Sequence, residues 1–131
     1  MPHPCIPQPL PAEGFDVPID RIDCAFRLLG FLPGHSHNSL NPRLVLYPAQ
    51  LELKVVRTSQ YEYTALRQVG YRAEGFLRRA KVELRFLGGE NYYLTLPSPA
   101  AEQDLLQFLW TRGATLTDAA TQQLGSAAAT S

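Results

Sequence analysis

The sequence predicts an α+β fold that is mainly β: a strongly bent antiparallel sheet or partly open β-barrel of about six or seven strands, capped by a C-terminal amphipathic helix. Short segments that alternate apolar and polar residues follow one another from position 43 to position 96, separated by proline and glycine. One well-marked helix comes after them. The chain has 131 residues, which suffices for a single hydrophobic core.

The first 42 residues are predicted to hold a leader, one strand and a loop. Residues 1–14 hold five prolines, which restrict φ and remove hydrogen-bond donors, so they predict a flexible, solvated leader. Residues 15–32 fit both a strand and a helix, and the alternation of Ile22, Cys24 and Phe26 favours a strand over 22–31. Residues 33–42 are rich in turn-forming residues and predict an exposed loop.

Two hairpins are expected in the middle of the chain. Residues 43–47 and 51–56 alternate and are joined across a proline-containing turn, and residues 79–86 and 92–96 alternate on either side of a Gly-Gly turn. Residues 61–71 predict a further extended segment with a bulge near Gly70, since the alternation there is imperfect.

The helix after these strands has clear start and stop signals. Ser98 is the expected N-cap, Pro99 is the first helical residue, and Gly113 follows the last apolar residue of the stripe. Residues 15–113 are therefore interpreted as one domain. Residues 114–131 are expected to form a short second helix over 117–124, capped by Thr117, and a frayed tail. The apolar stripe of the first helix contains Ala101, Leu105, Phe108 and Leu109, and is widened by Leu106 and Trp110.

This order of elements resembles the pleckstrin-homology-like superfold, including its bacterial and GRAM-type members. The resemblance is carried by the hairpin 43–54, the strand ending at Phe86, the Gly88-Gly89 turn and the helix segment 105–110. It implies that an aromatic residue of the C-terminal helix, Phe108 or Trp110, fills an open corner of the barrel. Members that bind phosphoinositides use a basic cluster between the first two strands, but residues 33–42 contain no Lys or Arg, which argues against that ligand.

Charge and composition limit the classes of partner. The 12 basic and 12 acidic residues balance, so the protein has no net charge that would attract nucleic acid. A protein partner is therefore expected before an anionic lipid. The sequence shows neither a secretory signal nor a long apolar run, which predicts a cytoplasmic protein without a transmembrane segment. Cys5 and Cys24 are expected to be reduced thiols.

No catalytic or cofactor motif is present. The serines lack the G-x-S-x-G context of a nucleophile, and no glycine pattern for nucleotide phosphates leads into a helix. His35 and His37 would bind a transition metal only if further ligands approached, so solvated histidines are expected there. The protein is therefore predicted to be no enzyme and to hold no metal or cofactor.

Two surfaces are candidates for binding. Basic residues dominate between positions 67 and 85 and could hold phosphate, an acidic peptide or single-stranded nucleic acid; the alternative is an ordinary solvent-exposed strand face that discourages edge pairing. Val45, Tyr47 and Val56 are expected on the outward face of the first hairpin, where they could form a docking or homodimer surface. The basic candidates are Arg67, Arg72, Arg79, Lys81 and Arg85.

Taken together, these features predict a non-enzymatic interaction module for a protein or peptide partner, including a second copy of itself. The main alternative is a small β-barrel that binds an apolar or anionic small ligand in its interior. An enzyme whose site is assembled from residues distant in sequence is the weakest alternative.

Overall fold

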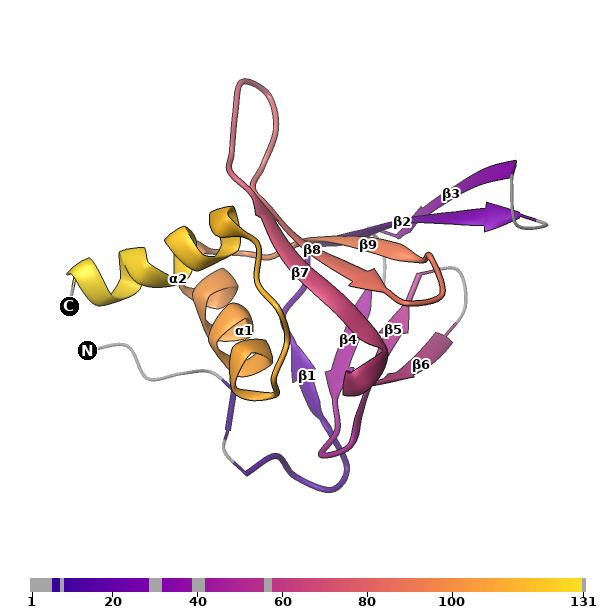
Figure 1. Cartoon of the computed structure of the whole chain (residues 1–131), viewed down its shortest axis with the longest axis horizontal. Coiled ribbons are helices and arrows are strands. Elements are labelled where there is room, and N and C mark those ends of the chain that lie inside the picture. Colours follow the sequence, from indigo (N-terminus) through magenta and orange to yellow (C-terminus); the bar gives the residue numbers. More distant parts are fainter. Residues whose placement is uncertain (1–5, 8, 29–31, 39–41, 56–57, 131) are drawn as a thin grey trace.

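The computed structural model describes residues 6–7, 9–28, 32–38, 42–55 and 58–130, which form two antiparallel sheets and two C-terminal helices (Figure 1). The mainly β class is confirmed, but the sheets do not close into a barrel. The four-stranded sheet has the order β1 (Phe15–Val17), β4 (Arg43–Leu46), β5 (Gln50–Lys54), β6 (Thr58–Glu62). The five-stranded sheet has the order β3 (Leu32–Asn38), β2 (Arg21–Leu28), β9 (Asn91–Thr95), β8 (Lys81–Phe86), β7 (Leu66–Arg72).

The chain passes from one sheet to the other between β6 and β7. A short 3-10 helix, Tyr63–Ala65, makes this connection, and the Tyr63 hydroxyl donates a 2.7 Å hydrogen bond to the carbonyl of Tyr47. The expected single extended segment over 61–71 is therefore wrong. The irregular register lies between Leu66 and Gln68 rather than near Gly70. A 3-10 turn has three residues per turn, which disrupts the alternation of a strand.

The loop expected over 33–42 is also largely wrong. Residues Leu32–Asn38 form β3, which pairs with β2 so that Cys24 lies opposite Ser36. β3 is an edge strand, so only one side of its backbone enters the sheet and Pro33 and Gly34 can be accommodated. Residues 29–31 and 39–41, the remaining parts of the predicted strand and loop, lie outside the described residues.

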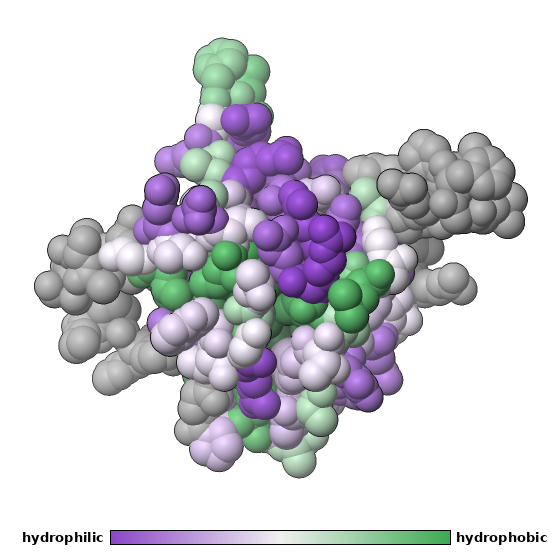
Figure 2. Space-filling view, in the orientation of Figure 1, coloured by the Kyte–Doolittle hydropathy of each residue, from purple (hydrophilic) through white to green (hydrophobic). Residues whose placement is uncertain are grey.

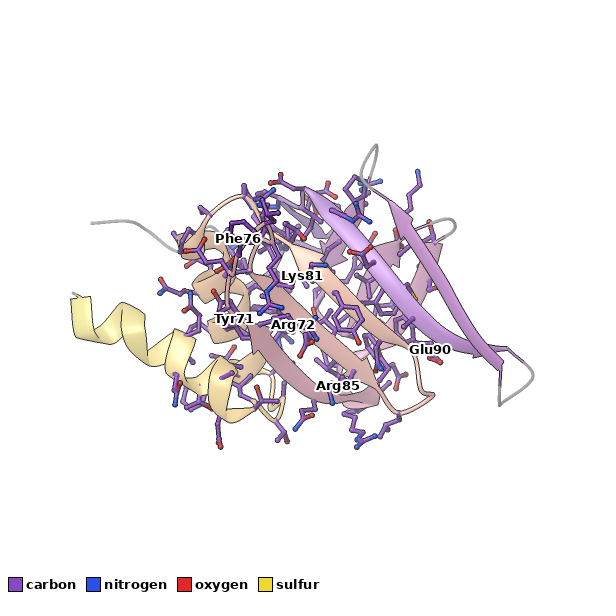
Figure 3. All side chains as sticks on the ribbon, turned by 90° about the horizontal axis from the view of Figure 1, so that it is seen from above. Tyr71, Arg72, Phe76, Lys81, Arg85 and Glu90 are labelled. Carbon is purple, nitrogen blue, oxygen red and sulfur yellow. The ribbon has the colours of Figure 1, made fainter. Side chains whose placement is uncertain are left out.

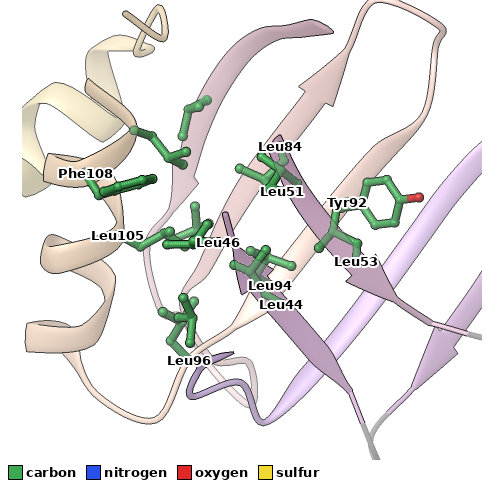
Figure 4. Packing of buried hydrophobic residues seen from close by; sticks show 14 of the residues in the cluster. Leu44, Leu46, Leu51, Leu53, Leu84, Tyr92, Leu94, Leu96, Leu105 and Phe108 are labelled. Atoms are coloured by element: carbon green, nitrogen blue, oxygen red, sulfur yellow. The ribbon is translucent and has the colours of Figure 1, made fainter. Parts of the chain in front are cut away.

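The core lies between the two sheets, and half of its buried residues are leucine (Figure 4). In the β4–β5 hairpin, Leu44 pairs with Leu53 and Leu46 with Leu51, and all four are buried. β8 and β9 supply Leu84 and Leu94 from the opposite sheet. Large side chains thus fill the space that an interior ligand would need, which counts against the barrel-ligand alternative.

Helix α1 (Pro99–Thr111) covers one end of the sheets (Figure 1). The predicted caps are confirmed, since the Ser98 hydroxyl accepts a 3.2 Å hydrogen bond from the Ala101 amide and Gly113 adopts φ +88°. Phe108 is 2% exposed and lies edge-on to Tyr63 at 5.8 Å, whereas Trp110 is 57% exposed. Phe108 is therefore the aromatic residue of α1 that joins the core.

The last element is longer than expected. Helix α2 (Asp118–Thr130) is capped by Thr117 as predicted, since the Thr117 hydroxyl accepts a hydrogen bond from the Ala120 amide. The helix continues past the predicted end at residue 124. Alanine favours helix after Gly125. The residues before α2 cover β7, since the Val69 amide donates to Thr115 and the Thr117 amide to Val69. Neither α1 nor α2 is long and apolar enough to cross a membrane.

The N-terminal segment contacts the core. Ile6 and Leu10 are buried with the core cluster, so a solvated leader is wrong for these two positions. They are the apolar residues that stand between the prolines, and their burial removes apolar surface from water.

Candidate functional site: the β7–β8 hairpin

The connection between β7 and β8 projects away from the rest of the molecule (Figure 1). It closes in a tight turn in which the amides and carbonyls of Gly75 and Arg78 exchange hydrogen bonds of 3.1 and 3.2 Å. Phe76 and Leu77 occupy the tip, and each is 91% exposed. Figure 2 shows this apolar tip above a hydrophilic region. The two most exposed large apolar side chains in the described chain are therefore adjacent and lie at the tip of a projecting hairpin.

Leu77 has a backbone conformation that leucine rarely adopts. Its φ is +59°, and it is the one described residue other than glycine with a positive φ. In this region the Cβ atom approaches the backbone carbonyl, which costs roughly 1–2 kcal/mol for most L-residues, whereas Gly and Asn tolerate it. An exposed leucine adds no core contact that would offset this cost. The turn is thus strained at a residue whose side chain faces solvent.

Replacing Leu77 with asparagine is expected to raise the free energy of unfolding by about 0.5–1 kcal/mol, because asparagine fits the left-handed region and no buried contact is lost. Urea denaturation followed by circular dichroism measures the change. The matched control is Phe76→Asn, since the φ of Phe76 is not positive and no gain is expected there. An unchanged or lower stability of Leu77→Asn would show that the turn is unstrained.

Cationic side chains surround the base of the hairpin. Figure 3 looks onto the outer face of the five-stranded sheet, where Arg72, Lys81 and Arg85 lie along β7 and β8. Most of these cations have a carboxylate partner in the sheet. The ion pairs are Arg72 with Glu83 at 3.4 Å, Arg79 with Asp20 at 2.8 Å, Lys81 with Asp23 at 3.4 Å and Arg85 with Glu83 at 3.7 Å.

Two carboxylates, Glu83 and Asp23, serve three of these pairs, and each is more buried than its cations. The side chain of Arg72 is 53% exposed but that of its partner Glu83 only 9%, and Asp23 is similarly buried. Burial alone would raise the pKa of Asp23, but the hydrogen bond from Arg21 and the charge of Lys81 outweigh it and hold that pKa below its ordinary value. Asp23 is thus charged at neutral pH, and the guanidinium groups form the outer, solvent-facing layer.

Arg78 differs from the other cations of the hairpin. It is exposed, adjoins the tip and has no carboxylate partner among the described residues. A Cβ atom added to Gly75 would lie 2.6 Å from its Nε atom, so glycine leaves room for the guanidinium group beside the turn. Within the part of the chain that the structure describes, Arg78 is therefore a cation without a carboxylate partner, and it follows directly after Phe76 and Leu77.

The basic residues selected from the sequence are only partly brought together. Arg72, Arg79, Lys81 and Arg85 each pair with a carboxylate, in three separate groups around Glu83, Asp20 and Asp23, while Arg67 is exposed near the opposite end of β7. Sequence reasoning missed these carboxylate partners, and it missed the tip. The available signal for the tip was Gly75-Phe76-Leu77-Arg78, two bulky apolar residues at a turn between strands.

The other candidate surfaces are less open than expected. Val45 does lie on the outward face of the first hairpin, since it alternates with the core residues Leu44 and Leu46 and pairs with Glu52. It is nevertheless buried, because the N-terminal segment covers it: a Cβ atom added to Gly14 would lie 2.6 Å from Cγ1 of Val45. Tyr47 is half-buried, and Val56 lies outside the described residues. A shallow groove between α1 and α2 exposes the ring of Trp110 beside Leu116 and Leu124.

The residues considered for metal or thiol chemistry do not assemble into a site in the described part of the chain. His35 and His37 belong to β3 rather than to a loop, opposite Ala25 and Asp23. The described residues contain no group of three potential metal ligands. Cys24 is a free, buried thiol, and its burial raises its pKa, so it is a poor nucleophile at neutral pH.

Comparison with known proteins identifies no relative: no protein-family model matches the chain, and no curated protein or solved structure matches it. The geometry of the hairpin is therefore the guide to function.

Proposed function

We propose that this protein is a non-enzymatic interaction module that contacts its partner through the tip of the β7–β8 hairpin. The observation that carries this proposal is the 91% exposure of both Phe76 and Leu77 on a projecting turn. Most large apolar side chains of the described chain are buried, so the tip departs from the pattern of the molecule. The strained φ of Leu77 supports the same conclusion, because strain at an exposed residue is typical of functional positions.

The energetics of the tip are compatible with reversible binding. Burial of a large apolar side chain contributes about 1.5–3 kcal/mol, so Phe76 and Leu77 together would contribute about 3–6 kcal/mol. Association costs about 4–15 kcal/mol in lost translational and rotational freedom, and most of this range exceeds what the tip alone contributes. The neighbouring cations would therefore have to contribute, and a weak, salt-dependent interaction is expected.

The same proposal includes a pleckstrin-homology-like architecture. Two bent antiparallel sheets and a C-terminal helix whose Phe108 enters the core support it. Such folds serve unrelated partners, so the likeness does not select one.

Two earlier expectations have less support. Binding of an anion by a free basic strand face would have to compete with Asp20, Asp23 and Glu83, which already pair with the cations. Self-association through the outward face of the first hairpin would have to proceed without Val45, which is buried. Contact through Phe76, Leu77 and Arg78 requires neither rearrangement.

Photo-crosslinking in cells tests the proposal. The photoreactive amino acid p-benzoylphenylalanine is placed at position 76 or at position 87 of the full chain. Leu87 is the matched control, because it is 68% exposed in the β8–β9 turn at the opposite end of β8. We expect a cross-linked product, to protein or lipid, from position 76 in clear excess over position 87. Absence of a product from position 76, or equal yields from both, would refute a binding role for the tip.

A further inference from the structure

We infer that the partner of the hairpin tip is the surface of a lipid bilayer that contains anionic lipids. This inference rests on the proposed function and names its partner. It concerns the turn 75–78 and the cations behind it, which lie on a different part of the chain from residues 33–42.

The first argument is the order of side chains along the hairpin. Phe76 and Leu77 lie at the tip, Arg78 stands next to them, and Arg72, Arg79 and Lys81 follow toward the sheet. A bilayer surface has the complementary order, with acyl chains at the depth the tip would reach and lipid phosphates at the level of the cations. Aromatic and arginine side chains are typical of this interfacial zone.

The second argument is the sign of the exposed charge. Residues 72–81 hold four cationic side chains and one carboxylate, Glu74. The ion-paired carboxylates Asp23 and Glu83 lie deeper than Lys81 and Arg72, so an approaching surface meets the cations first. Arg78 has no counter-charge in the described chain, and its binding to a phosphate would not break an existing ion pair.

The third argument is the shape of the tip. A stable protein interface buries roughly 800 Å² on each partner, over some 20–30 residues. The projecting turn presents two apolar side chains on a narrow, convex loop (Figure 2), and the surface behind it is charged. A rigid protein partner would need a deep pocket to surround this loop, whereas a bilayer deforms around a small insertion. The geometry therefore favours a lipid surface over a folded protein.

The test is co-sedimentation of the purified full chain with vesicles of phosphatidylcholine alone or with about one third phosphatidylglycerol. We expect binding to the anionic vesicles, weakened by added salt, and weak binding to the neutral ones. The double variant Phe76→Asn/Leu77→Asn should bind the anionic vesicles at least about tenfold more weakly, because both inserted side chains are lost.

Matched variants distinguish insertion of the tip into the bilayer from effects of losing any exposed leucine or any exposed arginine. Leu87→Asn removes an exposed leucine elsewhere and should bind like the wild type. Arg78→Gln should weaken binding to anionic vesicles several-fold, while Arg67→Gln, at the other end of β7, should not. Leu77→Asn alone is expected to be more stable than the wild type, so its weaker binding could not come from unfolding.

The inference is overturned if the wild type binds neither kind of vesicle, or if the double tip variant binds as tightly as Leu87→Asn. A failure here is distinguishable from failure of the proposed function. Cross-links from position 76 to protein, together with absent vesicle binding, would refute the lipid partner and leave the interaction role of the tip intact. Absent cross-links from position 76 would refute that role itself.

Discussion

Replacement of Phe108 with alanine is expected to lower the free energy of unfolding by about 3–5 kcal/mol. The ring is almost completely buried and contacts Tyr63 edge-on at 5.8 Å, so its removal leaves a cavity where α1 meets the connection between the two sheets. The Phe108 ring also contacts the guanidinium group of Arg112, whose central carbon lies 5.0 Å from the ring centre. Urea denaturation followed by circular dichroism measures the change.

Trp110 provides the control on the same helix. Its ring is 57% exposed, and Trp110→Ala should change stability by less than about 1 kcal/mol. Equal losses in the two variants would show that α1 does not depend on Phe108. Loss of the Phe108 ring is also expected to affect Arg112. The Nη1 atom of Arg112 donates a 2.6 Å hydrogen bond to the Pro48 carbonyl and so joins the end of α1 to the β4–β5 turn.

The elements that could be predicted are those whose signals are local. The β4–β5 and β8–β9 hairpins and helix α1 follow from alternation, turn residues and caps that lie within a few positions of one another. The serine cap and the glycine stop of α1 act on backbone groups one turn away. Such features do not depend on the rest of the fold.

The features that could not be predicted depend on distant partners. β3 contains Pro33, Gly34 and Asn38, and it is a strand because β2 offers a free edge to it. The segment 58–72 divides between two sheets because the chain turns at Tyr63–Ala65, and its length alone did not indicate that turn. Tertiary pairing outweighs local preference in both cases.

The candidate site also depends on contacts between residues that are distant in the sequence. Glu83 alternates with apolar residues along β8, and this pattern alone predicts a solvent-facing side chain. It is nevertheless buried, since Gly70 lies opposite it and Arg72 and Arg85 pair with it. A Cβ on Gly70 would approach its Oε1 atom to 2.7 Å, so the missing side chain makes room for the carboxylate. Sequence counting found the excess of arginine but could not find this pairing across strands.

Replacement of Gly14 with alanine is expected to lower the free energy of unfolding by about 3 kcal/mol, through two separate effects. Gly14 adopts φ +90°, which costs an L-residue roughly 1–2 kcal/mol. The new Cβ would also lie 2.6 Å from Cγ1 of Val45 and 2.7 Å from Cε1 of Tyr47, and Val45 is buried with little room to move. Overpacking of this kind costs about 1–3 kcal/mol. Urea denaturation measures the loss.

Gly89→Ala separates the two effects. Gly89 has a similar φ of +96°, but a Cβ added there meets no atom within 4 Å, so only the backbone cost of roughly 1–2 kcal/mol is expected. The excess loss in Gly14→Ala then measures how closely the N-terminal segment packs against β4, where Asp16 pairs with Val45. Equal losses would show that this segment is loosely held. An excess would show that the close approach at Gly14 helps to keep the N-terminal segment, with its buried Ile6 and Leu10, on the core.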